Sequence, residues 1–526
     1  MFRQHSIGGP APDGLARPLA VLFIAILGPA LPAAADITAA QVLVVYNSVA
    51  PDATVLKDAY LAVHPDIPAE NVFDINDPAL IVSDLTRAQF VSLVRDPIRS
   101  YLNQSGPPTP AGIVAIVLIR PFPHRLLDSD AGAIGDNPAA ASSEFYPGGD
   151  ATYSSLDADL VLLWQNLDTG EAGGMMDSKA DNIIDNPYHQ SATAIGSYTR
   201  SYIQTQKTFT NWGNVAWTLG GSGSTRLTPG DMYLVCRIDG TTLADAEASI
   251  TRAQNLYVNK ALVKVILDEY DETIAGGLDD DYLSSTSDPF YAGDDYEEAR
   301  TLLQANGWNV RYDDTFDFID GPEETAPIIA YASYGVNHVQ GGAGEAPAAG
   351  AAYIEGFHFP PGAIFNTIES FNGRALNGLS AFGQEQAADF IASGGTFAIG
   401  HVFEPFSFSI PDNEFLFTRM LVQHWTWGEA AYASLPCLSW QHVVLGDPLG
   451  KMTVLNDPGL PQGDLNGDGN ANGLDIALFT QMIVNGLAGY RAAYPTLDPI
   501  ARADFTGDYQ ITLEDVPGFV AALIGP

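Results

Sequence analysis

The sequence has few cysteines, few basic residues and no long hydrophobic segment. Only two of its 526 residues are cysteine, which excludes a disulfide-dense scaffold. Lysine and arginine total 23 against 63 aspartates and glutamates, and the net charge of −40 makes nucleic acid and anionic membranes poor partners. No segment reaches the roughly 18 uninterrupted apolar residues of a membrane-spanning helix. The sequence therefore predicts no nucleic-acid partner and no membrane span in the mature chain.

Familiar hydrolase and zinc-site motifs are also missing. The chain contains no His-Glu-x-x-His, no Gly-x-Ser-x-Gly and no Cys-x-x-Cys. The glycine-rich segment 219–224 lacks the Gly-Lys-Ser/Thr of a phosphate-binding loop, so we interpret it as a flexible loop. Cys236 lies in an apolar run and reads as a buried strand residue, and two unpaired thiols are favoured over a disulfide between Cys236 and Cys437.

The N-terminus predicts export. Arg3 and Arg17 precede a short apolar run, Leu19–Leu27, and Ala33-Ala-Ala35 follows as an A-x-A cleavage site. These features are typical of a signal peptide spanning residues 1–35. The mature protein is therefore expected outside the cytoplasm, either extracellular, at the cell surface or in the periplasm.

Two acidic loops near the C-terminus predict calcium binding. Oxygen-bearing side chains recur at loop positions 1, 3, 5, 9 and 12, and a backbone carbonyl at position 7 would complete the coordination of a hard Ca²⁺ ion. The expected ligand positions of the first loop are Asp464, Asn466, Asp468, Asn470, Asn472 and Asp475, and those of the second are Asp504, Thr506, Asp508, Gln510, Thr512 and Asp515. Two Ca²⁺ sites follow, and the second should be weaker because Thr506 replaces a stronger ligand and Tyr509 stands where a sharp turn favours glycine.

The two loops belong to a duplicated unit. Each acidic loop is followed by apolar residues with helical spacing, and the second unit repeats the first at an offset of forty residues. The expected apolar helix faces are Ile476, Phe479, Ile483 and Val484 in the first unit and Val516, Phe519, Leu523 and Ile524 in the second. A complete EF-hand would need an entering helix, which the Pro- and Gly-rich segment 457–463 does not allow.

Residues 461–526 resemble a dockerin, in the loop pattern Asp-x-Asn-x-Asp-Gly, in the aspartate that closes each loop, and in the linker with Tyr490 and Tyr494-Pro495. The resemblance implies a small all-α domain over residues 463–526 that folds around calcium and docks onto a cohesin-like protein partner. Residues 456–462 would then be the linker.

Between the leader and this module, residues 36–455 predict an α/β domain. Continuous apolar runs such as Val42–Tyr46, Ile113–Ile119 and Tyr233–Ile238 alternate with helical patterns, which favours a largely parallel sheet covered by helices on both faces. One large domain and two subdomains divided near residue 230 both fit. Further strands are expected at 261–267, 328–332, 363–367 and 397–400, and helices at 54–63, 87–102, 243–258, 296–306, 384–393, 414–424 and 428–435.

Polar residues after these strands are the candidates for catalysis, because ligands bind at the carboxyl ends of parallel strands. Ser370 could serve as a nucleophile with a histidine as its base, and the histidines and glutamates could instead hold a divalent ion. Structural roles for the same side chains remain open. The candidate catalytic residues are His338, Glu369, Ser370, His401 and Glu404.

Two resemblances concern the α/β region. The segments Pro361–Phe371, Phe397–Phe406 and Leu438–Leu449 resemble an uncharacterised family of exported bacterial proteins from species that carry exosortase, which implies no known activity. The alternating pattern and the terminal Leu-Gly-Asp-Pro are more weakly similar to gingipain-type peptidases of the caspase-like fold, in which a catalytic His and Cys follow successive strands. Here Ser370 stands at the position of the cysteine, so the resemblance favours a caspase-like fold without that chemistry.

Two functions remain from the sequence. The first is an exported calcium-binding protein whose dockerin-like module docks an α/β domain of unknown activity onto an extracellular partner. The alternative is an extracellular hydrolase of peptide or polysaccharide bonds, tethered in the same way and using the strand-end cluster of His, Glu and Ser.

Overall fold

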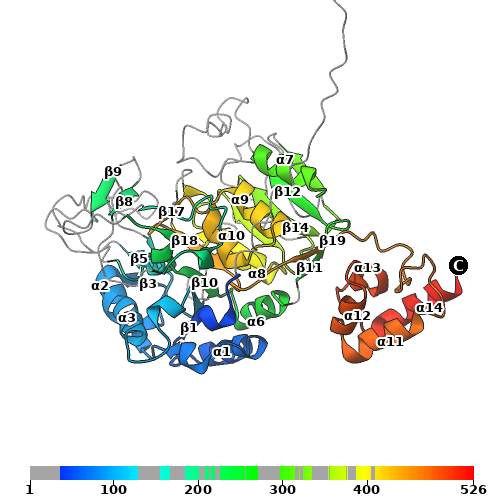
Figure 1. The fold of residues 1–526 in the computed structure, drawn as a ribbon, viewed down its shortest axis with the longest axis horizontal. Helices are drawn as coiled ribbons and strands as arrows, with labels where there is room; N and C mark the ends of the chain where they lie inside the picture. Colours follow the sequence, from blue (N-terminus) through cyan, green and yellow to red (C-terminus); the bar gives the residue numbers. More distant parts are fainter. Residues whose placement is uncertain are drawn as a thin grey trace, which may run out of the picture. The chain divides into compact units, whose positions relative to one another are not determined.

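A ten-stranded sheet forms the centre of the α/β region in the computed structural model (Figure 1). The strand order is β13-β12-β14-β15-β16-β18-β10-β4-β1-β2. The strands are β1 (Val42–Tyr46), β2 (Val72–Asp74), β4 (Ala115–Ile119), β10 (Leu234–Ile238), β12 (Lys264–Asp268), β13 (Val310–Asp313), β14 (Ile328–Ser333), β15 (Ile364–Thr367), β16 (Phe397–His401) and β18 (His442–Leu445). The structure describes residues 36–127, 154–165, 184–200, 208–211, 215–218, 226–254, 256–269, 296–313, 319, 321, 324–334, 354, 356–374, 376, 387–403, 405 and 409–525.

The prediction of a largely parallel sheet is confirmed, but the sheet contains one reversal. The strands of one set, β1, β2, β4, β10 and β18, run parallel to one another. The strands of the other set, β12, β13, β14, β15 and β16, are also parallel to one another. The two sets meet at β16 and β18, which pair antiparallel from Ala398↔Leu445 to His401↔His442. The carboxyl ends of the two sets therefore lie at opposite edges of the same sheet.

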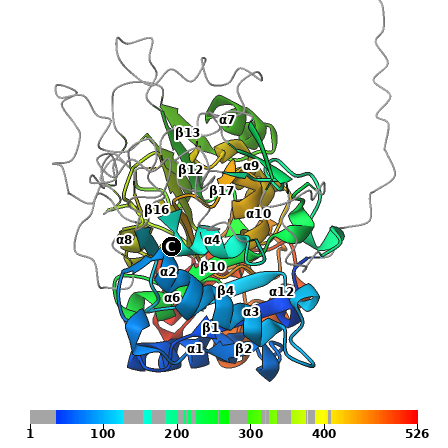
Figure 2. The same ribbon diagram turned by 90° about the vertical axis from the view of Figure 1, so that its left-hand side faces the viewer.

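Helices cover both faces of this sheet, as the continuous apolar strands require (Figures 1 and 2). One layer packs α1, α6 and α8 side by side, and the other contains α4, α7, α9 and α10. The helices are α1 (Pro51–Val63), α2 (Arg87–Phe90), α3 (Asp96–Leu102), α4 (Leu156–Val161), α6 (Leu243–Arg252), α7 (Tyr296–Ala305), α8 (Ala387–Ala392), α9 (Asn413–Phe417) and α10 (Trp427–Ser434). Within the described ranges, no helix combines the length and the hydrophobicity needed to cross a membrane.

Three predicted helices differ from the structure. The helix expected at 87–102 is divided into α2 and α3 by a π-helical turn at Val91–Arg95, and α9 likewise continues into a π-helical turn at Thr418–Val422. The helix expected to reach residue 258 ends at Arg252, because the last residues form β11 (Tyr257–Asn259), which pairs with β19 (Thr453–Leu455). Tyr257 and Val258 are aromatic and β-branched and suit a strand once a partner strand is present.

Smaller strands complete the region. They are β3 (Asp84–Thr86), β5 (Arg125–Leu127) and β6 (Ser154–Ser155) in a three-stranded sheet, and β7 (Ile184–Asp185), β8 (Thr208–Asn211), β9 (Val215–Thr218) and β17 (Cys437–Leu438) in a four-stranded sheet. Both cysteines are free, in agreement with the sequence prediction, and burial raises the pKa of each thiol well above its ordinary value.

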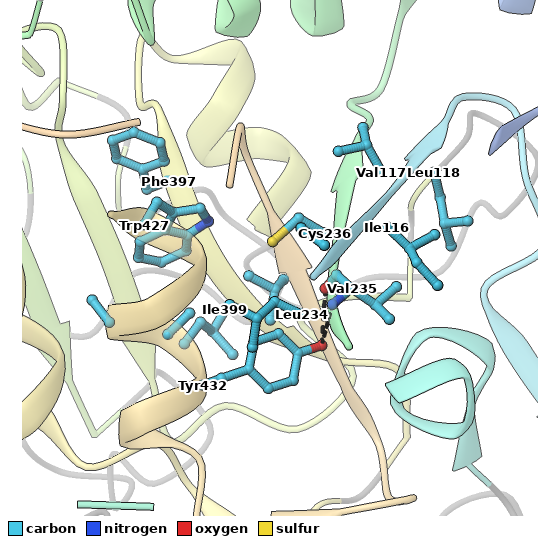
Figure 3. Packing of buried hydrophobic residues seen from close by; sticks show 14 of the residues in the cluster. Ile116, Val117, Leu118, Leu234, Val235, Cys236, Phe397, Ile399, Trp427 and Tyr432 are labelled. Carbon is cyan, nitrogen blue, oxygen red and sulfur yellow. Dashed lines mark hydrogen bonds between the residues drawn. The ribbon is translucent and has the colours of Figure 1, made fainter. Parts of the chain in front are cut away.

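The side chain of Tyr432 lies between β10 and β18 at the point where the two strands separate. These strands share one register pair, Arg237↔Leu445. Two residues earlier in β10, the Tyr432 hydroxyl of α10 donates to the Val235 carbonyl oxygen at 2.9 Å and accepts from the Val235 amide at 3.3 Å, as Figure 3 shows. The side chain thus satisfies backbone groups that a neighbouring strand would otherwise pair. Phe397 and Trp427 stack nearby, with ring centroids 4.9 Å apart.

The C-terminal module is helical. It contains α11 (Ile476–Asn485), α12 (Ala488–Ala493), α13 (Pro499–Ala503) and α14 (Val516–Ile524), coloured orange to red in Figure 1. Its small core is separate from those of the α/β region and includes Leu465, Phe479, Met482, Tyr490 and Phe519. The predicted apolar faces are confirmed at Phe479 and Phe519, which are buried, and at Ile483, Val516 and Leu523, which pack against this core. Ile476, Val484 and Ile524 are exposed.

Candidate functional sites

The carboxyl ends of β14, β15 and β16 place part of the predicted cluster at one edge of the sheet. Glu369 and Ser370 follow β15, and His401 is the last residue of β16. The His401 Nδ1 atom lies 3.4 Å from the backbone oxygen of Glu369. Two of the five predicted residues, His338 and Glu404, lie outside the described residues. The structure therefore brings His401 beside the segment Glu369–Ser370.

These side chains are deeply buried. His401 and Glu369 have no exposed surface, and Ser370 is 9% exposed. The His401 amide donates to the Asn372 side-chain oxygen at 2.6 Å, which fixes the end of β16 against the turn after β15. Burial lowers the pKa of His401 to about 4, although the contact with the Glu369 backbone oxygen opposes this shift. A neutral, enclosed imidazole is the result.

The reversal in the sheet separates Asp239 from this edge. The strand-end argument assumes that the strands run in one direction, so that the end of β10 would lie beside those of β15 and β16. Because β10 is parallel to β18, and β18 is antiparallel to β16, Asp239 follows its strand at the opposite edge. There it lies 3.2 Å from Arg237 Nη1, within a fully buried ion cluster that also contains Asp157. The role of Asp239 is thus to balance a buried charge.

The structure adds His442, which the sequence did not single out. His442 begins β18 and is the register partner of His401, so the two rings lie on the same face with centroids 5.8 Å apart. Burial, and then the neighbouring His401, lowers the pKa of His442 well below its ordinary value. The motif Trp440-Gln-His442 at the start of an apolar strand could have indicated a buried histidine, but not its partner, which is forty-one residues away in the sequence.

The two acidic loops have the same hydrogen-bond pattern. Asp464 accepts from the amides of Gly467 and Gly469, and Asp504 accepts from those of Gly507 and Tyr509, forty residues later. The last aspartates also correspond. Asp475 accepts from Leu465, Asn466 and Asn472, and Asp515 accepts from Phe505, Thr506 and Thr512.

The sixth position differs between the loops. Gly469 has φ +91°, and Tyr509 adopts a left-handed φ of +62° at the equivalent position. A side chain is strained in this conformation, whereas glycine is not. The backbone of the second loop is therefore the more strained at this position.

The donor set of the loops is compatible with a hard cation. Each loop contributes carboxylate oxygens at positions 1, 5 and 12, and the first adds the amide side chains of Asn466 and Asn472 and the backbone oxygen of Asn470 at position 7. In the described part of the chain, no three His, Cys, Asp or Glu side chains are close enough together to hold a metal ion. Carboxylates at positions 1 and 12 instead accept loop amides, and Asp468 accepts from Asn466 Nδ2 at 3.2 Å. The loops therefore suit a hard cation in their donor atoms and in their backbone conformation.

Comparisons with family models, with curated proteins and with solved structures find no match to this chain.

Proposed function

We propose that the chain is an exported calcium-binding protein whose C-terminal, dockerin-like module attaches the α/β region to a cohesin-like protein partner. The observation that supports this most strongly is the duplicated loop structure. Six hydrogen bonds from backbone amides, three of them accepted by the closing aspartate of each loop, recur at the same offset of forty residues. Two loops that are prearranged in the same way are expected to bind the same kind of ion.

The surface of the module supports attachment to a partner. Of thirteen large apolar side chains exposed among the described residues, six belong to the module. Val484 and Ile524 occupy equivalent positions in the two repeats and are 72% and 79% exposed. Apolar side chains that a small domain leaves in solvent at matching positions suit a protein-binding surface.

The α/β region is assigned no reaction. A residue that reacts with a substrate must be reachable, and His401 and Glu369 are fully buried. The hydrolase alternative would require the segment Glu369–Ser370 to open, and no described contact favours such an opening.

Calcium titration of the whole chain tests the proposal. Isothermal titration calorimetry should detect two sites, of which the first loop is the tighter. Asp475→Asn should remove the first site and Asp504→Asn the second, because each substitution replaces a charged ligand. Glu514→Gln is the matched control, since it removes a carboxylate at a loop position that is not expected to coordinate the ion.

The proposal fails if calcium at millimolar concentration produces no binding signal. It also fails if Glu514→Gln weakens binding as much as Asp504→Asn, because the effect would then be one of net charge alone.

A further inference from the structure

Arg502 of α13 is bonded to two acidic residues from different segments. Its Nε and Nη2 atoms bind the two carboxylate oxygens of Asp457 at 2.7 and 3.0 Å. Its Nη1 atom donates to the backbone oxygen of Asp464 at 2.5 Å and lies 3.4 Å from Asp464 Oδ2. All three residues are at most 5% exposed. The side chain of Asp464 is the first expected ligand of the first calcium loop.

Asp457 is fixed to the α/β region on its other side. It lies two residues beyond β19, and Asn259 at the end of β11 binds its backbone twice, through Nδ2 to the Asp457 oxygen at 2.5 Å and through Oδ1 from the Asp457 amide at 3.0 Å. Residues 35–526 form one compact unit. Asn259, Asp457, Arg502 and Asp464 thus form a continuous chain of contacts from β11 to the first loop.

One guanidinium serves two buried carboxylates in this arrangement. Burial opposes ionisation of Asp457, but the hydrogen bonds from Arg502 and from the backbone amides of Asp498 and Gly459 together outweigh it and hold the pKa of Asp457 below its ordinary value. Asp464 has Arg502 as its nearby cation, at a longer distance. A divalent cation at the first loop would provide Asp464 with a second positive charge. The attraction between Arg502 and Asp464 would then weaken, which favours the pairing of Arg502 with Asp457.

We propose that Arg502 couples calcium binding by the first loop to the attachment of the C-terminal module at Asp457. This inference rests on the proposed function, because it requires calcium at Asp464. Calcium strengthens the Arg502–Asp457 pair, and the pair in turn favours calcium, since coupling between two binding events is reciprocal. Arg502 is a positioning residue here, because its Nη1 atom holds the backbone of Asp464 while the carboxylate remains available for the ion.

Calcium affinity measured on the whole chain is the first test. Asp457→Asn removes the main partner of Arg502, which then pairs with Asp464 and competes with the ion. The affinity of the first loop should fall about tenfold. Asp498→Asn is the matched control, because Asp498 belongs to the same junction, and an asparagine there can still cap α13. It should change the affinity less than twofold, and an equal effect of the two variants overturns the inference.

Hydrogen–deuterium exchange of the segment 456–463 is the second test. Calcium should slow exchange in this segment, which lies outside both loops, and Asp475→Asn should abolish the slowing. Arg502→Lys keeps the positive charge but cannot bind Asp457 in a bidentate geometry. The variant protein should bind calcium, but calcium should slow exchange in the segment 456–463 only slightly. Unchanged exchange in a wild-type chain that binds calcium overturns the coupling alone. A wild-type chain that binds no calcium contradicts the proposed function as well.

Discussion

Phe479 and Phe519 stack with ring centroids 4.0 Å apart and planes inclined by 11°. They hold the same position in the two repeats, and each is buried. Equivalent residues of the two repeats therefore contact each other at the centre of the module, and this aromatic pair connects the helices that follow the two acidic loops.

Replacement of either ring should destabilise the module. Phe479→Ala and Phe519→Ala should each lower its free energy of unfolding in urea by about 3 kcal/mol, through lost burial and the cavity that remains. The double variant should lose less than the sum, because both single variants remove the same stacked pair. Ile476→Ala, at a 48% exposed site on the same helix, is the control. Additive losses would contradict a direct contact.

The exposed apolar pair of the module should matter for binding but not for folding. Val484→Lys and Ile524→Lys should each weaken binding to an isolated cohesin domain at least about tenfold, since a charge would be buried at the interface. Stability should change by about 0.5 kcal/mol or less at such sites. Leu302→Lys, at a 38% exposed site on α7, serves as the control in surface plasmon resonance. Equal weakening by the control, or no cohesin binding at all, would count against the docking surface.

Loss of the Tyr432 hydroxyl should destabilise the α/β region. Tyr432→Phe leaves the buried Val235 amide and carbonyl without the hydroxyl that binds both, at a cost of about 1–3 kcal/mol. Tyr494→Phe is the control, because it removes a tyrosine hydroxyl from a half-buried site in the C-terminal module and leaves the α/β region unchanged. Chemical denaturation of the α/β region measures the difference, and equal stability of the Tyr432→Phe variant and the wild type would exclude a role for this contact.

Acidification should destabilise the fold through its buried histidines. The pKa of His401 falls to about 4 when it is buried, against an ordinary value of about 6.5 in the unfolded chain. Between these values the unfolded state binds a proton that the folded state does not. The contribution of His401 to the free energy of unfolding is therefore fully present above about pH 6.5, and it is lost as the pH falls towards 4. The loss from this one group is about 3 kcal/mol.

Urea denaturation at several pH values tests this expectation. His401→Gln should show a shallower decline between pH 6.5 and pH 4 than the wild type. His64→Gln is the control, because His64 is partly exposed and its Nε2 atom contacts Asp447 Oδ2 at 2.6 Å. Identical pH profiles for His401→Gln and the wild type would show that His401 is not the group responsible.

Much of the α/β fold could be predicted from local patterns. The strand expected at 42–46 is β1 without change, and α7 and α10 lie within one residue of their expected bounds. Such segments are long apolar or amphipathic runs, whose periodicity is a local property. The strands β11 and β19 were missed because each has three residues and is stabilised by its partner, about two hundred residues away in the sequence.

The candidate catalytic site shows the limit of strand-end reasoning. That reasoning assumes one direction for all strands, and the antiparallel pairing of β16 with β18 reverses half of the sheet. His442 became a neighbour of His401 through this pairing, and Asp239 was placed at the other edge. No local pattern specifies the direction in which a distant strand joins the sheet.

By itself, the sequence determined the charge of the protein, the α/β class of its main region and the offset of forty residues at which the acidic loop recurs. These properties depend on composition and on spacing within one segment. The tertiary structure alone decided which repeated residues are buried, so that Phe479 meets Phe519 while Val484 and Ile524 remain in solvent. It also decided that Arg502 is shared between Asp457 and Asp464. Contacts of this kind depend on how helices and strands pack, and packing joins residues that are far apart along the chain.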